Sequence, residues 1–145
     1  MTTPAPEVDV EDFVIAYLIG LGIVTAAQIS ARMPEKLTPP FVLVQRVAGG
    51  DDLLVDHSTV SIHSFDTDQT AASDLARAIH HAMRQLRTKV TVTMPDGSIV
   101  NPYGPTRTEQ TPIFVQWEPG GGGAVLSRYV GRYLIDLRLP SITAF

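Results

Sequence analysis

An amphipathic pattern in the middle of the chain restricts the folds open to this sequence. Between residues 67 and 86, apolar side chains recur at the three- and four-residue spacing of one helix face. Asp66 and Gln69 form a predicted capping box, so we predict a helix from Thr67 to about Leu86. The predicted buried arc consists of Ala71, Leu75, Ala78, Ile79, Ala82 and Leu86. A helix with one apolar face needs a second layer to pack against, and the flanking segments must supply it.

The C-terminal part of the chain predicts a long strand, because side chains alternate in character over Ser127–Leu139. The apolar face of this strand carries Tyr129, Tyr133, Ile135, Leu137 and Leu139. The charged face carries Arg128, Arg132, Asp136 and Arg138. This charged face is either an ordinary solvent-exposed face or a salt-bridging surface, and the sequence leaves both interpretations open.

Shorter patterns predict the remaining elements. Asp9 is a predicted N-cap for an N-terminal helix that ends at Gly20 and Gly22. Further strands are predicted at Ala27–Met33, Phe41–Ala48, Asp56–Phe65, Lys89–Met94, Ile99–Tyr103 and Ile113–Trp117. Turns or loops are predicted at Gly49–Asp52, Pro95–Ser98, Asn101–Pro112 and Glu118–Ala124. Phe41–Ala48 is apolar on both faces, so we expect a central strand that is covered on both sides.

The order of helix, strands, helix and strands indicates an α+β fold. We expect a mostly antiparallel β-sheet with two helices packed on one face, plus protruding β-hairpins and loops. No internal repeat and no long linker divides the sequence, so residues 1–145 are predicted to form a single domain. Residues 1–7 form a Pro-rich polar leader that we expect to be mobile.

The chain carries few charges for its size. Of its 145 residues 18% are charged, against about 25% in an average soluble domain, and 44% are hydrophobic. That hydrophobic fraction is sufficient for a buried core and excludes a disordered chain. A surface poor in charge is typical of proteins that are partly covered by another protein. The composition therefore predicts a component of an assembly.

Charge, cysteine content and hydropathy exclude several classes of protein. The net charge is −4, so the overall field does not attract DNA or RNA, and we expect no sequence-specific nucleic-acid partner. The absence of cysteine removes disulfide scaffolds, thiolate zinc sites and cysteine nucleophiles. The most apolar stretch, Phe13–Ala27, has 15 residues where a membrane-spanning helix needs about 20. Acidic residues precede it instead of a basic leader, so we expect a soluble, unexported protein with no membrane partner.

The histidines do not form a metal-binding pattern. His57 and His63 share one predicted strand face, but six residues separate them by about 20 Å, which is too far for one metal ion. His80 and His81 are adjacent on the predicted central helix and do not form an i, i+4 ligand pair. His80 is predicted to lie nearly opposite the apolar arc. We expect all four to face solvent or an interface.

No motif typical of catalysis or phosphate binding is found either. No serine lies in a G-x-S-x-G elbow, and Gly120–Gly123 lack the lysine and the following helix of a phosphate-binding loop. Asp51 and Asp52 predict a solvated turn, since no further oxygen ligands are patterned around them. We therefore expect no catalytic residue, no cofactor and no metal. The glycine run predicts a hairpin loop that stays mobile until a partner orders it.

Four stretches, in this order, resemble the tail terminator proteins of long-tailed bacteriophages. They are VDVEDFVIAYLIGL, FVLVQRVAGGDD with VSIHSF, SFDTDQTAASDLARAIHHAM and RYVGRYLIDLRLP, and together they cover about Val8 to Pro140. The family has no invariant catalytic motif, so the resemblance is one of layout. It implies an α+β subunit that assembles into a ring, usually a hexamer, with no reaction and no cofactor.

The resemblance also implies partners and a location. The ring caps the finished tail tube, stops further addition of the major tail tube protein, and offers a surface to the head-completion or neck proteins. The tape-measure protein is a further possible partner. The implied location is the head-proximal end of the tail in the virion, and the host cytoplasm during assembly. Another head–tail connector or minor tail protein is the nearest alternative; a small α+β enzyme or ligand-binding domain is an alternative of a different class.

Two sets of residues are candidates for contacts in such an assembly. The acidic start of the first helix and the charged face of the closing strand are complementary, and their pairing between subunits would help to fix the ring register. The candidate charges are Asp9, Glu11 and Asp12 together with Arg128, Arg132, Asp136 and Arg138. The candidate mobile contacts are the Pro95–Ser98 hairpin, the loop Asn101–Pro112, and the run Gly120, Gly121, Gly122 and Gly123.

Overall fold

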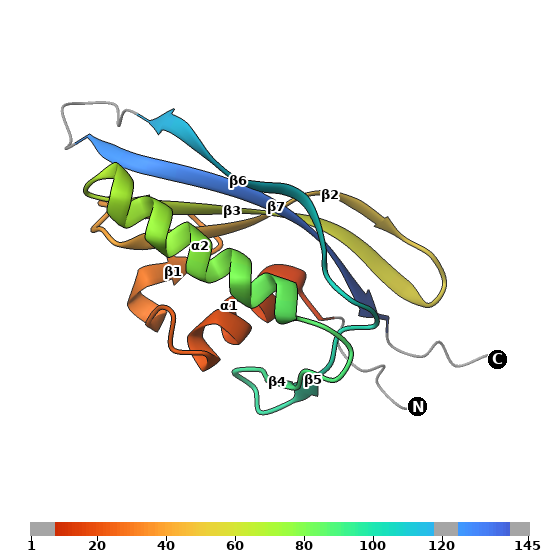
Figure 1. Cartoon of the computed structure of the whole chain (residues 1–145). Helices are drawn as coiled ribbons and strands as arrows, with labels where there is room; N and C mark the ends of the chain where they lie inside the picture. The colour runs from red at the N-terminus through yellow and green to blue at the C-terminus, as the bar shows by residue number, and fades with distance from the viewer. Residues whose placement is uncertain (1–7, 118–124, 140–145) are drawn as a thin grey trace.

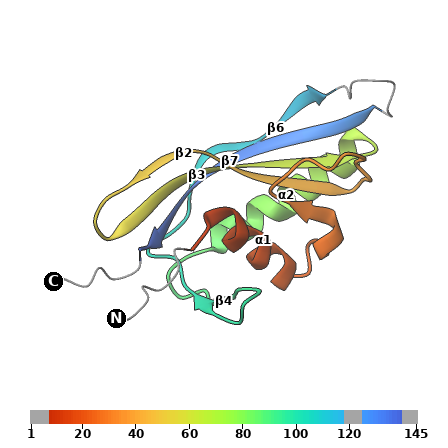
Figure 2. The same ribbon diagram turned by 180° about the vertical axis from the view of Figure 1, so that it is seen from behind.

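A bent five-stranded sheet organises the chain, and two α-helices lie on one of its faces (Figures 1 and 2). The computed structural model describes residues 8–117 and 125–139. The elements are α1 (Val10–Gly20), the 3₁₀ helix η1 (Ala26–Gln28), β1 (Ile29–Ser30), β2 (Phe41–Asp51), β3 (Val55–Asp66), α2 (Gln69–Gln85), β4 (Val92–Thr93), β5 (Ile99–Val100), β6 (Arg107–Trp117) and β7 (Leu126–Arg138). The predicted α+β fold with a mostly antiparallel sheet is confirmed.

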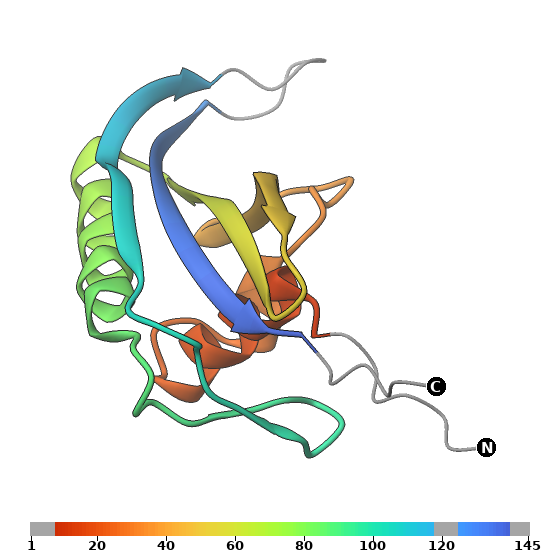
Figure 3. The same cartoon turned by 90° about the vertical axis from the view of Figure 1, so that its right-hand side faces the viewer.

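The strand order in the large sheet is β1-β2-β3-β7-β6. Short β1 runs parallel to β2, and all other neighbours are antiparallel. The two longest strands pair along their whole length, with Val55 of β3 opposite Arg138 of β7 at one end and Asp66 opposite Ser127 at the other. Figure 3 shows the bend of β7 along this sheet. The small hairpin of β4 and β5 is separate and flanks the predicted Pro95–Ser98 turn.

The main core lies between the sheet and both helices. Its fully buried members come from α1, α2, β2, β3 and β7 and include Phe13, Leu18, Val42, Ile62, Ile79, Met83, Tyr133 and Ile135. One hydrogen bond joins the helices inside this core, because the Tyr17 hydroxyl donates to the carbonyl oxygen of Ala82 at 2.7 Å. Ala82 is in the last turn of α2, where the helix does not supply an N–H donor for every carbonyl.

Helix α2 differs from its prediction in two details. Asp68, not Asp66, is the N-cap, and its side chain accepts from the backbone N–H of Ala71 at 2.8 Å. The buried side is also shifted by about one residue, so that Ala78 is exposed. Five helix residues and the C-cap are buried, namely Ala72, Ala76, Ile79, Ala82, Met83 and Leu86. Paired alanines at 71–72 leave the phase of the apolar arc ambiguous in the sequence, because either alanine fits a buried position.

The predicted turn at Gly49–Asp52 is wrong for its first three residues. Strand β2 continues through Asp51, with a bulge between Arg46 and Ala48 that realigns it with β3. The chain reverses at residues 52–54, where the Asp52 carboxylate accepts from the backbone N–H groups of Leu54 and Val55 at 2.8 Å each. This part of the hairpin, the β2–β3 extension, reaches beyond the helices (Figure 1), and β7 stays paired with β3 as far as Val55. Only Phe41–Val44 of β2 are buried. The expectation that this strand is covered along its length is therefore wrong for its second half.

Other strand predictions need new boundaries, and of Lys89–Met94 and Ile99–Tyr103 only Val92–Thr93 and Ile99–Val100 are strand. β6 begins at Arg107, so most of the predicted loop Asn101–Pro112 is strand. Pro112 indicated a loop, but β6 is an edge strand in which register shifts accommodate a residue without an N–H donor. Of the predicted strand Ala27–Met33, only Ile29 and Ser30 pair. Residues 1–7 and the glycine run lie outside the described residues, and no helix in the described ranges is long and apolar enough to cross a membrane.

Candidate interaction surface

The acidic start of α1 is used largely within the subunit. Asp9 caps the helix, and its carboxylate accepts from the N–H groups of Glu11 at 2.7 Å and Asp12 at 3.3 Å. The Glu11 carboxylate accepts from the backbone N–H of Arg46 on β2 at 2.9 Å. The Asp12 side chain is exposed, and partial desolvation of its carboxyl, followed by the nearby Asp9 charge, raises its pKa. Two of the three carboxylates predicted for subunit contacts therefore already have partners.

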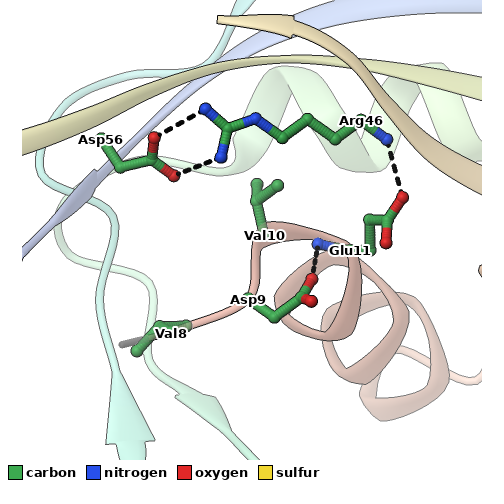
Figure 4. A pocket seen from close by; sticks show the side chains of 6 residues that line it. All are labelled: Val8, Asp9, Val10, Glu11, Arg46 and Asp56. Atoms are coloured by element: carbon green, nitrogen blue, oxygen red, sulfur yellow. Dashed lines mark hydrogen bonds and ion pairs between the residues drawn. The ribbon is translucent and has the colours of Figure 1, made fainter. Parts of the chain in front are cut away.

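A hollow of about 320 Å³ lies between this helix start and the sheet (Figure 4). The Arg46 guanidinium forms two hydrogen bonds to Asp56, at 2.9 and 3.1 Å, in the bidentate geometry that favours arginine–carboxylate pairs. Asp56 is buried and also accepts from the Ser58 hydroxyl at 3.0 Å. The charged groups that line the hollow are therefore paired with one another. The hydrogen bond from the Arg46 N–H to Glu11 connects α1 to β2, and the Arg46–Asp56 pair connects β2 to β3.

The charged face of β7 has the predicted composition, but its charges do not pair with one another. Among the described residues, Arg128, Arg132 and Arg138 form no ion pair. Asp136 instead meets His57 of β3, with Oδ1 at 2.8 Å from Nδ1, and lies 3.9 Å from a guanidinium nitrogen of Arg107. Arg128 is partly buried, and its buried Nε has no acceptor among the described residues.

His63 on β3 lies on the same face as these arginines. Its Nε2 is 3.0 Å from the Ser61 hydroxyl, whereas its buried Nδ1 has no partner among the described residues. Burial, followed by the charges of Arg128 and Arg132, lowers the pKa of His63 to about 4. The ring is therefore neutral at neutral pH. Although Ser61 and His63 resemble a nucleophile–base pair, Ser61 is 2% exposed, and no carboxylate of the described residues orients the ring.

Apolar side chains lie between these charges. Ile113 of β6 is directly opposite Val130 of β7, so both side chains share the face of Arg128 and Arg132. Ile113 is 48% exposed, whereas Val130 is buried at 7%. We call this surface the cationic patch, and its members are His63, Ile113, Arg128, Val130 and Arg132. The sequence placed the arginines on one face but missed His63 and Ile113, because only the strand register brings them there.

The turn between β2 and β3 presents a second surface. Leu53 and Leu54 are 79% and 62% exposed, and Asp51 and Asp52 beside them are exposed as well. We call residues 51–54 the arm tip. The apolar pair directly after two acids is visible in the sequence and indicates such a surface. Exposed leucines at the end of a projecting hairpin are typical of a contact with another protein.

His57 connects the arm tip to β7 by hydrogen bonds. Its Nδ1 is 2.8 Å from Asp136, and its Nε2 is 3.1 Å from the Asp52 carboxylate. These hydrogen bonds, the one to Asp136 first, raise the pKa of His57. His57 and His63 therefore have separate partners.

The remaining predicted residues are placed as follows. His81 is exposed and bonds to Gln85, but His80 is not opposite the apolar side of α2 as predicted. Its Nδ1 lies 2.9 Å from the buried Tyr133 hydroxyl, because the true buried arc is shifted toward it. Within residues 8–117 and 125–139, no three His, Asp or Glu side chains are grouped so as to hold a metal ion.

Comparison with known proteins adds no assignment. No protein-family model matches the chain, and no curated protein matches it. The described surfaces and the layout of the sequence are therefore the indications of function.

Proposed function

We propose that this protein is a structural virion assembly protein that forms a ring, caps the phage tail tube and stops its polymerisation. The resemblance to tail terminator proteins supplies the role, and the surfaces of the subunit support self-assembly. In this proposal the ring, usually six subunits in the family, also offers the head-completion or neck protein a place to attach. The protein then acts through its surfaces, with no reaction and no cofactor.

The observation that carries the proposal is exposed apolar area at two separate places on one sheet. Leu53 and Leu54 are 79% and 62% exposed at the arm tip. Ile113 and Phe114 are 48% and 46% exposed on the edge strand β6, on opposite faces of the strand. Large apolar side chains in groups on a folded surface favour burial against another protein. Two such places on one subunit support contacts with two neighbours, as a ring requires.

The edge strand adds support of a second kind. Within the described residues β6 is the edge strand of the sheet, so its outer backbone groups are available to a partner. The half of β6 with register shifts and Pro112 is poorly suited to strand pairing, whereas the regular half begins at Ile113. The exposed apolar residues lie on this regular half. A neighbouring subunit or the tube protein therefore has a suitable surface there.

Electron microscopy of the full chain tests the proposal. The purified protein is imaged alone and after mixing with tail tubes polymerised from the tube protein of the same virus. We expect rings at one end of each tube, and sedimentation should give their mass as a small multiple of 15.7 kDa. A monomer in free solution is compatible with the proposal, because a ring can assemble on its template.

Other outcomes of this experiment contradict the proposal. Protein that binds along the tube, or at the opposite end, is a minor tail protein with another role. Protein that binds purified neck or connector complexes but not tubes is a head–tail connector. Protein that binds neither but gains thermal stability from a small molecule is a ligand-binding domain or an enzyme.

A further inference from the structure

The arm tip and the cationic patch lie at opposite ends of β3. The arm tip directly precedes Val55, the first residue of the strand, while His63 of the patch lies eight residues further on. At about 3.3 Å per residue, this separation is about 26 Å along the strand. The two surfaces of one subunit therefore do not touch each other, and each is open to another molecule.

The two surfaces are complementary in charge and polarity. The arm tip combines two exposed leucines with the exposed carboxylates of Asp51 and Asp52. The cationic patch combines exposed Ile113 with Arg128 and Arg132, which form no ion pair among the described residues. An acidic, apolar projection thus matches a cationic, apolar surface on the same chain.

The arginines of the cationic patch are able to bind a carboxylate from a partner. Arg132 is exposed, Arg128 is half-buried, and neither forms an ion pair in the described part of the chain. A carboxylate placed beside these guanidinium groups forms charge-assisted hydrogen bonds with them. Asp51 is the better candidate, since Asp52 is already engaged by His57 and by two backbone N–H groups.

We propose that the arm tip of one copy docks on the cationic patch of the next copy, with its leucines against Ile113 and with Asp51 beside Arg128 and Arg132. This inference rests on the proposed function, since it names the contact between neighbouring subunits of the ring. The contact joins different surfaces of the two partners, and such a head-to-tail contact closes into a ring when its rotation closes. In this contact the arm tip is the partner of the β7 arginines, whereas the sequence predicted the acids of α1 for that role.

Cysteine cross-linking tests the contact directly, because the chain contains no cysteine of its own. Leu53→Cys and Ile113→Cys proteins are mixed at high concentration and oxidised. We expect a disulfide-linked dimer from the mixture, and a ladder of covalent oligomers from a chain that carries both substitutions. Leu53→Cys mixed with Ile99→Cys is the matched control, because Ile99 is 66% exposed on the separate β4–β5 hairpin. Equal cross-linking in the control would overturn the inference.

Charge reversal gives a second, independent test. Asp51→Arg and Arg132→Glu each replace an exposed residue, and circular dichroism verifies that both variants fold. We expect each single variant to associate at least tenfold more weakly than the wild-type protein, and the double variant to recover most of the loss. Association of both single variants at wild-type strength would contradict the contact, as would a double variant no stronger than the singles.

Failure of the inference and failure of the proposed function give different results. Rings on tube ends, without cross-linking of residue 53 to residue 113, overturn the inference and leave the proposed function intact. Specific cross-linking between these residues, without any capping of tubes, overturns the proposed function and supports a head-to-tail assembly of another kind.

Discussion

At the scale of single residues, Gly49 shows how one backbone position determines the shape of the β2–β3 extension. Its φ of +128° lies in a region that side chains rarely adopt, and a β-carbon there would overlap the carbonyl oxygen of His57. Because the clash is with backbone, a side-chain movement does not relieve it. The bulge at residues 46–48 and this glycine together bring β2 into register with β3.

Gly49→Ala is therefore expected to lower the free energy of unfolding by about 2 kcal/mol or more. Gly50→Ala is the matched control, since nothing lies within 4 Å of a β-carbon at that position. The control should change stability by less than about 0.5 kcal/mol. Urea unfolding of the two variants and the wild-type protein measures the difference. Equal stabilities for both variants would show that the extension is not held at Gly49.

His63 predicts a pH dependence of stability. Its pKa is about 4 in the folded protein, against the ordinary value of 6.5, because burial and the charges of Arg128 and Arg132 disfavour the imidazolium. Between these two values the unfolded chain binds a proton that the folded chain does not bind. The contribution of His63 to stability is therefore fully present above about pH 6.5 and is lost as the pH falls toward about 4.

The variant His63→Gln should flatten the decrease in unfolding free energy between pH 6.5 and 4.5. His81→Gln is the control, because His81 is exposed on α2 and bonds only to Gln85 among the described residues. Chemical unfolding at several pH values gives both slopes. A steep wild-type slope that persists unchanged in His63→Gln would rule out His63 as its source.

At the scale of elements, the N-terminal cap of α2 provides a direct check. The Asp68 carboxylate accepts from the N–H of Ala71, so Asp68→Ala should lower the free energy of unfolding by about 1 kcal/mol. Asp74→Ala on the exposed side of the same helix should have an effect below about 0.5 kcal/mol. Thermal unfolding compares the two. A larger loss for Asp74→Ala would contradict the assigned cap.

Elements with strong periodicity were predictable, and those whose limits depend on tertiary pairing were not. The alternation at Ser127–Leu139 gave β7 to within one residue at each end. By contrast, Gly49 and Gly50 indicated a turn, although pairing with β3 holds them in a strand. Pro112 likewise indicated a loop, although pairing with β7 and the register shifts accommodate it within β6. Local residue preferences carry no information about which strand lies alongside.

At the scale of the whole molecule, the candidate surfaces follow from topology more than from local sequence. The arginines of β7 were predicted on one face, because alternation alone determines that. Their neighbours His63 and Ile113 come from other strands, and only the order β3-β7-β6 brings them together. The acids at residues 9 and 11 were predicted to pair between subunits, but helix capping and Arg46 engage them within the subunit. The arm tip remains as an exposed acidic surface.

The two surfaces differ from each other and lie near opposite ends of the subunit. An arm tip at one end of β3 and a cationic patch near the other end favour an assembly in which each copy contacts two neighbours by different faces. A ring of this kind presents the same surfaces repeatedly around its circumference. That arrangement suits a cap on a tubular polymer that is itself built from repeated subunits.

The length of tail tubes grown in the presence of the protein tests the central claim most directly. Tube protein is polymerised with the wild-type chain, more tube protein is added, and tube lengths are measured by electron microscopy. We predict that the tubes stop growing once each has one ring at its end, whereas tubes grown with the Leu53→Ser/Leu54→Ser variant continue to elongate. Tubes that elongate equally with and without the wild-type protein would contradict the claim.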